Sequence, residues 1–152
     1  MTLLNIENLV PHKPPMRLLD GLASYDEKTA TCVVKLTHAS PFMRQGRVPA
    51  VVAMEYMAQC VAAYATLHAD KNVEANPESL RKPKLGYLVG VRRLDLFVND
   101  FVSGDELIVQ VTHLWGAEAG AQFQGIVTRG GVTVAAANLT VFVPPDQPQG
   151  EA

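Results

Sequence analysis

The sequence predicts an α+β fold in which an antiparallel sheet of about six strands wraps around one long central helix. One twenty-residue stretch, "VPAVVAMEYMAQCVAAYATL", is apolar enough for a helix that is buried on all sides. Two strand-like runs precede this stretch and four follow it, divided by turn residues. A sheet covers one side of a helix, so we expect a curved sheet, with a second subunit covering what remains exposed.

The segments before the helix have strand and turn signals. Residues 16–25 and 29–37 alternate well enough to be paired strands, with a turn at residues 26–28. Residues 38–49 contain Ser-Pro, Gly and Pro, which predict a loop. This half of the chain therefore supplies a hairpin and a connection into the helix.

The helix and the later strands complete the pattern. Pro49 stands at or near the first helical turn, and the helix is expected to end around residues 69–70. The polar segment that follows, residues 71–84, is expected to be a surface connection. Gly130-Gly131 is a hairpin signal. Four strands are expected in meander order, at residues 85–98, 106–114, 123–129 and 132–143.

This order of elements is that of the hotdog architecture, which usually forms dimers. We expect one hotdog domain over residues 1–143. Residues 144–152, "PPDQPQGEA", are expected to be a disordered tail, because that segment is polar and rich in proline. The sequence shows no internal repeat and no second domain.

The composition narrows the class of protein. The 152 residues are 48% hydrophobic and 18% charged, with a net charge of −2, so nothing favours nucleic acid or an anionic membrane as a partner. The N-terminus lacks a basic region followed by an apolar one, which favours a cytoplasmic protein. A membrane span is the alternative interpretation of the apolar stretch, but Glu55 and Gln59 would oppose insertion. Cys32 and Cys60 show no metal-ligand spacing and are expected to be reduced and buried.

Glu55 is the one formal charge in the apolar stretch. At about 100° per residue it shares a helix face with Val51, Gln59, Ala62 and Thr66. A carboxyl group among apolar side chains is a candidate general acid or base. The alternative is a structural glutamate that bonds to loop amides and holds residues 44–48 in place.

The start of the helix is a second candidate feature. Backbone N–H groups near Val48, Ala50 and Val51 could face a carbonyl oxygen, and such donors are what a thioester-activating enzyme needs; Val48 and Ala50 are the first choice. The alternative is that Gln45 or water caps these amides.

Among the four histidines, His12 and His38 are the candidates for chemistry. His12 lies between proline-restricted segments, and His38 precedes a Ser-Pro turn. His68 and His113 read as structural. No pair has metal-ligand spacing, so we expect no metal, and no nucleophile elbow or nucleotide-binding loop is present.

Basic residues recur in several loops and could form a positive rim. Such a rim would suit an acidic carrier protein or a phosphate-bearing thioester arm, and the alternative is scattered solubilising charge. The residues are Lys13, Arg17, Arg44, Arg47, Arg81, Lys82, Lys84, Arg92 and Arg93.

Three segments resemble the FabZ-type 3-hydroxyacyl-carrier-protein dehydratases. "LVPHKPPMRLLD" is similar to that family's "LPHRYPFLLVD", "VPAVVAMEYMAQ" to "MPGVLIIEAMAQ", and "FVNDFVSGDELIV" to "RFKRPVVPGDQLRL". The three occur in the family's order, and the resemblance covers roughly residues 9–114. It implies that Glu55 is the catalytic acidic residue and that Gln59 is the glutamine of the family's helix.

The loop before the helix departs from that family. The family places its catalytic histidine in "PFFxGHFPGxPxMPG", whereas this chain has the shorter "SPFMRQGRVPA", which has no histidine. The chain looks more like the short-loop dehydratase-like proteins found with aryl-polyene synthesis genes, which share "VPHxxPM" and "VPA…EYMAQ". His12 is the first candidate to replace the missing histidine and His38 is the second; a third possibility is that nothing replaces it.

The resemblance implies a 3-hydroxyacyl thioester dehydratase that serves fatty-acid-like or aryl-polyene chain elongation without a cofactor. Its substrate would be bound to an acyl carrier protein or CoA, and the chain would form a homodimer or a heterodimer with another hotdog protein. The expected catalytic residues are Glu55 and His12. The expected substrate-binding residues are Val48, Ala50, Phe42, Met54, Gln59 and Leu88. The alternatives are a hotdog acyl thioesterase, in which Glu55 activates water, and a non-catalytic acyl-binding or partner subunit of a dehydratase complex.

Overall fold

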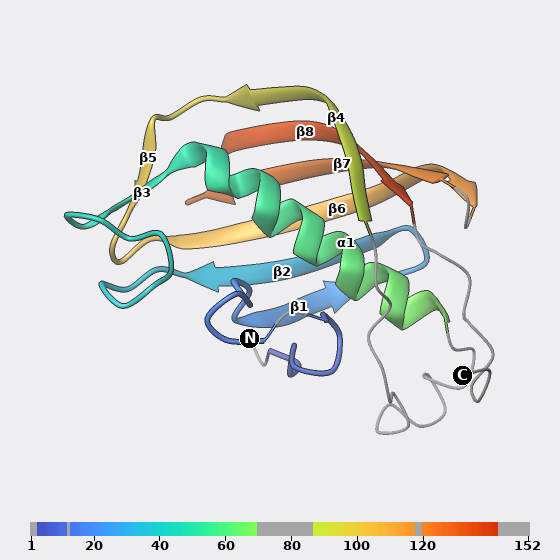
Figure 1. Ribbon diagram of the computed structural model, residues 1–152, viewed down its shortest axis with the longest axis horizontal. Coiled ribbons are helices and arrows are strands. Elements are labelled where there is room, and N and C mark those ends of the chain that lie inside the picture. Colours follow the sequence, from blue (N-terminus) through green and yellow to red (C-terminus); the bar gives the residue numbers. More distant parts are fainter. Residues whose placement is uncertain (1–2, 12, 70–86, 118–119, 143–152) are drawn as a thin grey trace, which may run out of the picture.

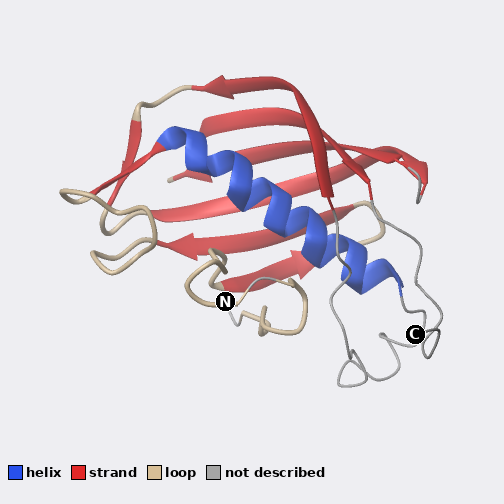
Figure 2. Cartoon of the chain, in the orientation of Figure 1, coloured by secondary structure: helices blue, strands red, loops and turns tan. Residues whose placement is uncertain are grey.

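The computed structural model describes residues 3–11, 13–69, 87–117 and 120–142. One six-stranded antiparallel sheet, in the order β1-β2-β6-β7-β8-β4, curves around a single long helix (Figures 1 and 2). The elements are β1 (Gly21–Tyr25), β2 (Thr29–Lys35), β3 (Arg47–Pro49), the short 3-10 helix η1 (Ala50–Val52), α1 (Ala53–Ala69), β4 (Tyr87–Leu96), β5 (Asp100–Val102), β6 (Glu106–Ala117), β7 (Gly120–Arg129) and β8 (Val132–Phe142). The prediction of a hotdog fold with six strands around one central helix is confirmed. The predicted tail lies outside the described residues.

The strand order differs from the predicted meander at β4. Strands β6, β7 and β8 do follow one another as a meander, but β4 pairs with β8 at the far edge of the sheet. The chain leaves the sheet after β4, forms β5, and re-enters it as β6 beside β2 (Figure 1). The prediction was wrong because periodicity reports that a segment is a strand and carries no information on its neighbours.

The first strand is shorter than predicted. It begins at Gly21, and the backbone before it turns instead, with the N–H groups of Met16 and Arg17 both donating to the Lys13 carbonyl, at 2.7 and 3.1 Å. This turn leaves the segment around residues 16–18 free to lie against the helix, which matters for the candidate site.

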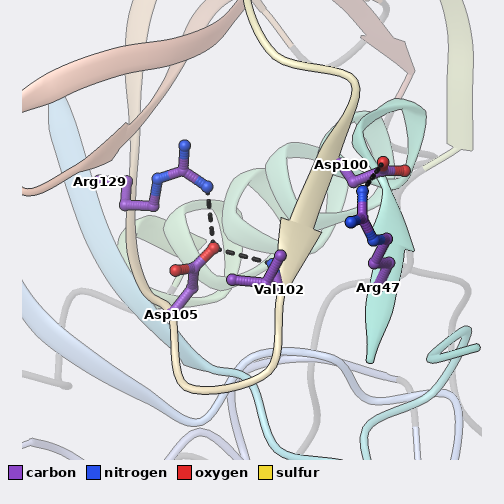
Figure 3. A network of polar contacts seen from close by, with 5 residues as sticks. All are labelled: Arg47, Asp100, Val102, Asp105 and Arg129. Carbon is purple, nitrogen blue, oxygen red and sulfur yellow. Dashed lines mark hydrogen bonds and ion pairs between the residues drawn. The ribbon is translucent and has the colours of Figure 1, made fainter. Parts of the chain in front are cut away.

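A two-stranded ribbon of β3 and β5 lies where the sequence predicts only a loop. Val48 and Phe101 are opposite each other in the ribbon, and both are fully buried. On its outer face the Arg47 guanidinium lies 3.4 Å from the Asp100 carboxylate (Figure 3). Strands of three residues are too short to show an alternation in sequence, so the ribbon could not be predicted.

The turn between β5 and β6 is held by one carboxylate. Asp105 accepts hydrogen bonds from the Val102 N–H and from Arg129, each at 2.9 Å (Figure 3). Because Val102 ends β5, this contact fixes the ribbon to the main sheet. The ribbon in turn leads directly into η1 and α1, so it sets where the helix begins.

The helix lies in the concave face of the sheet. Met57 is fully buried, and a Cβ atom built on Gly125 of β7 would lie 2.6 Å from its sulfur, so only glycine permits this approach. The segment Ala50–His68 is long and apolar enough to cross a membrane, yet 67% of its apolar window is buried inside the protein. Burial against the sheet therefore accounts for its composition, as the central-helix interpretation expects.

The two cysteines join the helix to the sheet by packing. Cys32 on β2 and Cys60 on α1 are fully buried free thiols whose sulfur atoms are 3.4 Å apart. This confirms the expectation of reduced, buried cysteines. Burial, and then the neighbouring Cys32, raises the pKa of the Cys60 thiol, so this thiol stays protonated. Both cysteines belong to the hydrophobic core.

The C-terminal part of α1 is tied to the sheet by polar and aromatic contacts. The His68 ring stacks on Tyr64 with centroids 4.0 Å apart, and its Nε2 lies 2.9 Å from the Asp26 carbonyl. The centroids of the His113 and Phe123 rings are 5.1 Å apart. Both histidines thus have the structural surroundings that the sequence suggests.

Candidate active site

Glu55 lies in the first turn of α1, where it is partly buried. A carboxylate at this position interacts favourably with the positive end of the helix dipole. It occupies the end of the helix that follows the β3–β5 ribbon, so the ribbon and the helix together determine the direction of its side chain. One of its contacts is a hydrogen bond from Gln59 Nε2 at 3.2 Å.

Gln59 connects Glu55 to the N-terminal segment. Its Oε1 accepts from the Leu18 N–H at 2.9 Å, and its Nε2 donates to the Met16 carbonyl at 2.8 Å as well as to Glu55. The side chain is fully buried, and its two N–H donors and its oxygen all have partners. The sequence analysis expects Gln59 to bind substrate; the observed contacts instead make it the residue that holds Glu55 and the segment at residues 16–18 together.

We expect Gln59→Leu to lower the free energy of unfolding by about 2–4 kcal/mol, since the buried Leu18 N–H and the Met16 carbonyl both lose their partner. Turnover should fall as well, because Glu55 loses a donor. Urea unfolding followed by circular dichroism measures the first effect. The matched control is Gln110→Leu, because Gln110 is exposed and its side chain bonds only to the Thr31 hydroxyl among the described residues. An equal loss of stability in both variants would show that the buried Gln59 bonds stabilise the fold no more than an exposed one does.

One of the amides at the helix start is not disposed as the sequence analysis expects. Val48 is buried in the ribbon opposite Phe101, and the Ala50 N–H donates to the Asn99 carbonyl at 3.0 Å. The Ala50 amide therefore already has an acceptor, which argues against its assignment to a substrate carbonyl, while the assignment of the Val48 amide stays a prediction. The next amide along the chain is that of Val51, in the first turn, where N–H groups have no acceptor within the helix, and Val51 is 49% exposed.

The other expected binding residues are spread over several elements. Phe42 is an exposed loop residue, and Met54 is half-buried beside Glu55 on α1. Leu88 pairs with Val141 in the β4–β8 ladder, and its side chain lies outside what the structure describes. These residues therefore do not define one pocket within the described part of the chain.

Of the two candidate histidines, the structure describes only His38. His12 lies outside the described residues. His38 is exposed in the loop after β2, where its ring lies beside the backbone of Gly46. It belongs to the same loop that leads into β3 and then into the helix.

A small cavity lies beside the N-terminal segment and was not anticipated. Its polar lining includes Arg17, Asp20, Ser40 and Tyr56. Burial, and then the Asp20 carboxylate, raises the pKa of Tyr56 to about 12, so its hydroxyl is a neutral donor. No sequence signal marks this cavity, because its walls come from four separate segments.

The comparisons with known proteins agree on one family of dehydratases. The model of the ApeP-like family, described as ApeP dehydratase, matches residues 4–151. A 3-hydroxyacyl-[acyl-carrier-protein] dehydratase FabZ of Anaeromyxobacter is 31% identical over 125 residues, which are 77% of this chain and 75% of that relative. The FabZ of Vibrio atlanticus is 28% identical and is matched over 91% of each chain.

Solved structures are similar over most of the chain. The dehydratase heterocomplex ApeI:P from Xenorhabdus doucetiae has a chain that superposes with a TM-score of 0.80 at 25% identity, covering 95% of this chain and 94% of that one. A hypothetical thioesterase with coenzyme A from Streptococcus pneumoniae superposes with a TM-score of 0.60 at 12% identity, covering 84% and 90%. The second likeness shows the shared fold alone.

Proposed function

The chain belongs to the ApeP-like dehydratase family, and from this premise we propose that it removes water from a 3-hydroxyacyl thioester carried by an acyl carrier protein. The observation that carries the residue assignment is the position of Glu55, partly buried in the first turn of the helix and bonded to the anchored Gln59. The reaction belongs to fatty-acid-like chain elongation, and we further propose the aryl-polyene form of it.

The chemistry explains why a held carboxyl group is needed. Dehydration takes a proton from the carbon alpha to the thioester carbonyl and delivers a proton to the departing hydroxyl, so that a 2-enoyl thioester and water form. The reaction neither oxidises nor reduces the substrate, and therefore calls for acid–base groups alone. We assign Glu55 as one of these groups, because Gln59 holds its carboxylate through a hydrogen bond.

The negative charge that develops on the thioester oxygen needs a donor. The Val51 N–H is suited to this role, because it lies one turn from Glu55 at the positive end of the helix. It replaces the Ala50 amide in the proposed mechanism.

We propose His12 as the second acid–base group. It stands four positions before Met16 in the sequence, and the Met16 carbonyl accepts a hydrogen bond from Gln59 Nε2 at 2.8 Å. Four residue steps span at most about 14 Å, and this short chain length between His12 and the anchored Met16 supports the choice of His12. His38 is the second choice, because it lies in the loop that leads to the helix.

A partner subunit is part of the proposal. One similar solved structure is a dehydratase heterocomplex, and this supports a heterodimer of the chain with another hotdog protein; a homodimer is the alternative.

The test is incubation with a 3-hydroxyacyl group bound to an acyl carrier protein, with the chain alone and with a hotdog partner added. Mass spectrometry of the carrier should show loss of one water and a 2-enoyl product. Release of free carrier thiol would instead support the thioesterase alternative. Turnover by the partner at the same rate with and without the chain would support a non-catalytic subunit.

A further inference from the structure

Phe42 has a backbone conformation that is unfavourable for its residue type. Its φ is 66°, and the side chain is 49% exposed. The Met43 N–H donates to the Ser40 carbonyl at 3.2 Å, which closes a turn with Pro41 in the second position and Phe42 in the third. When φ is positive at the third position, that position is normally occupied by Gly or Asn. An exposed aromatic residue there is strained, and such strain gathers at functional positions.

Arg44, two residues on, is exposed beside a second tight turn. It exchanges backbone hydrogen bonds with Arg47, at 2.8 and 3.0 Å, across Gln45 and Gly46. Arg47 is paired with Asp100, whereas Arg44 forms no ion pair with any residue that the structure describes. Between Phe42 and Arg44, Met43 packs against the core. Met43 thus anchors the loop, while the Phe42 ring and the Arg44 guanidinium, which has no ion-pair partner among the described residues, are exposed.

This loop lies at the end of the molecule where α1 begins (Figure 1). Two further exposed apolar side chains belong to the same end, Val51 in η1 and Val102 in β5. We call Phe42, Arg44, Val51 and Val102 the docking face. Val51 stands four positions before Glu55, so a protein seated on the docking face could deliver a flexible thioester arm to the helix start.

We propose that the docking face binds the acyl carrier protein itself, with Phe42 as the apolar anchor and Arg44 facing a carboxylate of the carrier. This inference rests on the proposed function, because that function supplies the carrier-bound substrate. An unpaired exposed arginine favours an acidic partner, and an aromatic residue held in a fixed conformation loses little entropy on binding. Phe42 thereby moves from the acyl pocket, where the sequence analysis places it, to the protein–protein contact.

The test is Phe42→Gly, with Gln45→Gly as the matched control. Gln45 also has a positive φ, 53°, so glycine relieves backbone strain at both positions. Both variants should therefore melt about 2 °C higher than the unmodified chain. Only Phe42→Gly should weaken binding of an acidic type II acyl carrier protein bearing its phosphopantetheine arm, by about tenfold in Kd. Calorimetric titration in the assembled protein measures Kd.

The proposal is overturned if the Kd for the carrier protein is unchanged in Phe42→Gly, or if Gln45→Gly weakens carrier binding equally. It is also overturned if Phe42→Gly changes the number of subunits in the assembly, which would assign Phe42 to the contact with another hotdog subunit. A fourth contrary result comes from kinetics. If KM for a short pantetheine thioester rises as much as KM for the carrier-bound substrate, Phe42 lines the acyl pocket instead. Binding is measured without turnover, so a chain that binds the carrier but forms no 2-enoyl product refutes the dehydratase assignment and leaves the docking face in place.

Discussion

Glu55→Gln should reduce kcat for dehydration by about 10³-fold or more while leaving the fold intact. Glutamine has the same shape as glutamate and still offers an oxygen to Gln59 Nε2, which donates to Glu55 at 3.2 Å. What it cannot do is accept and return a proton. The rate of 2-enoyl thioester formation measures the loss, and thermal unfolding measures the fold.

Glu106→Gln is the control for this prediction. Glu106 is exposed at the start of β6, opposite Lys35 of β2, and the same change of charge there should leave turnover within about twofold. If Glu55→Gln retains full turnover in the assembled enzyme, Glu55 is structural and the chemistry belongs to another group or to the partner subunit. If it loses turnover together with its cooperative unfolding, the carboxylate acts by stabilising the helix start.

Gly125→Val should destabilise the chain by about 3 kcal/mol or more, with a melting temperature lower by roughly 6–12 °C. A Cβ at this position would approach Met57 Sδ to 2.6 Å and Met57 Cβ to 3.2 Å. Met57 is fully buried, so it has no open space into which it can move. The helix must therefore lift off the sheet or the strand must bend, and chemical unfolding followed by circular dichroism measures the loss.

The control for the glycine is Gly90→Val on the edge strand β4. A Cβ there meets no atom within 4 Å, and valine favours the strand conformation, so stability should change by less than about 0.5 kcal/mol. Met57→Ala in the Gly125→Val chain should recover part of the loss by removing the sulfur. If the two valine variants prove equally stable, the helix does not pack as closely on β7 as the structure shows.

Part of the candidate site could be derived from residue spacing. Glu55 and Gln59 stand four apart, and a helix places such residues on one face, where the structure finds them bonded. The sequence did not indicate what Gln59 binds on its other side. Its partners, Met16 and Leu18, are about forty residues away in the chain, and their backbone groups carry no sequence signal.

The sequence by itself determined the six strands of the main sheet, the long central helix and the carboxylate Glu55 within that helix, because alternation, turn residues and helical spacing are local properties of the chain. Only the tertiary structure decided that β4 lies beside β8, that β3 pairs with β5, and that the Ala50 amide is used by Asn99. Each of these depends on backbone hydrogen bonds between distant segments. Every residue other than proline offers the same backbone donor and acceptor, so the identity of the side chains does not specify which segments will pair.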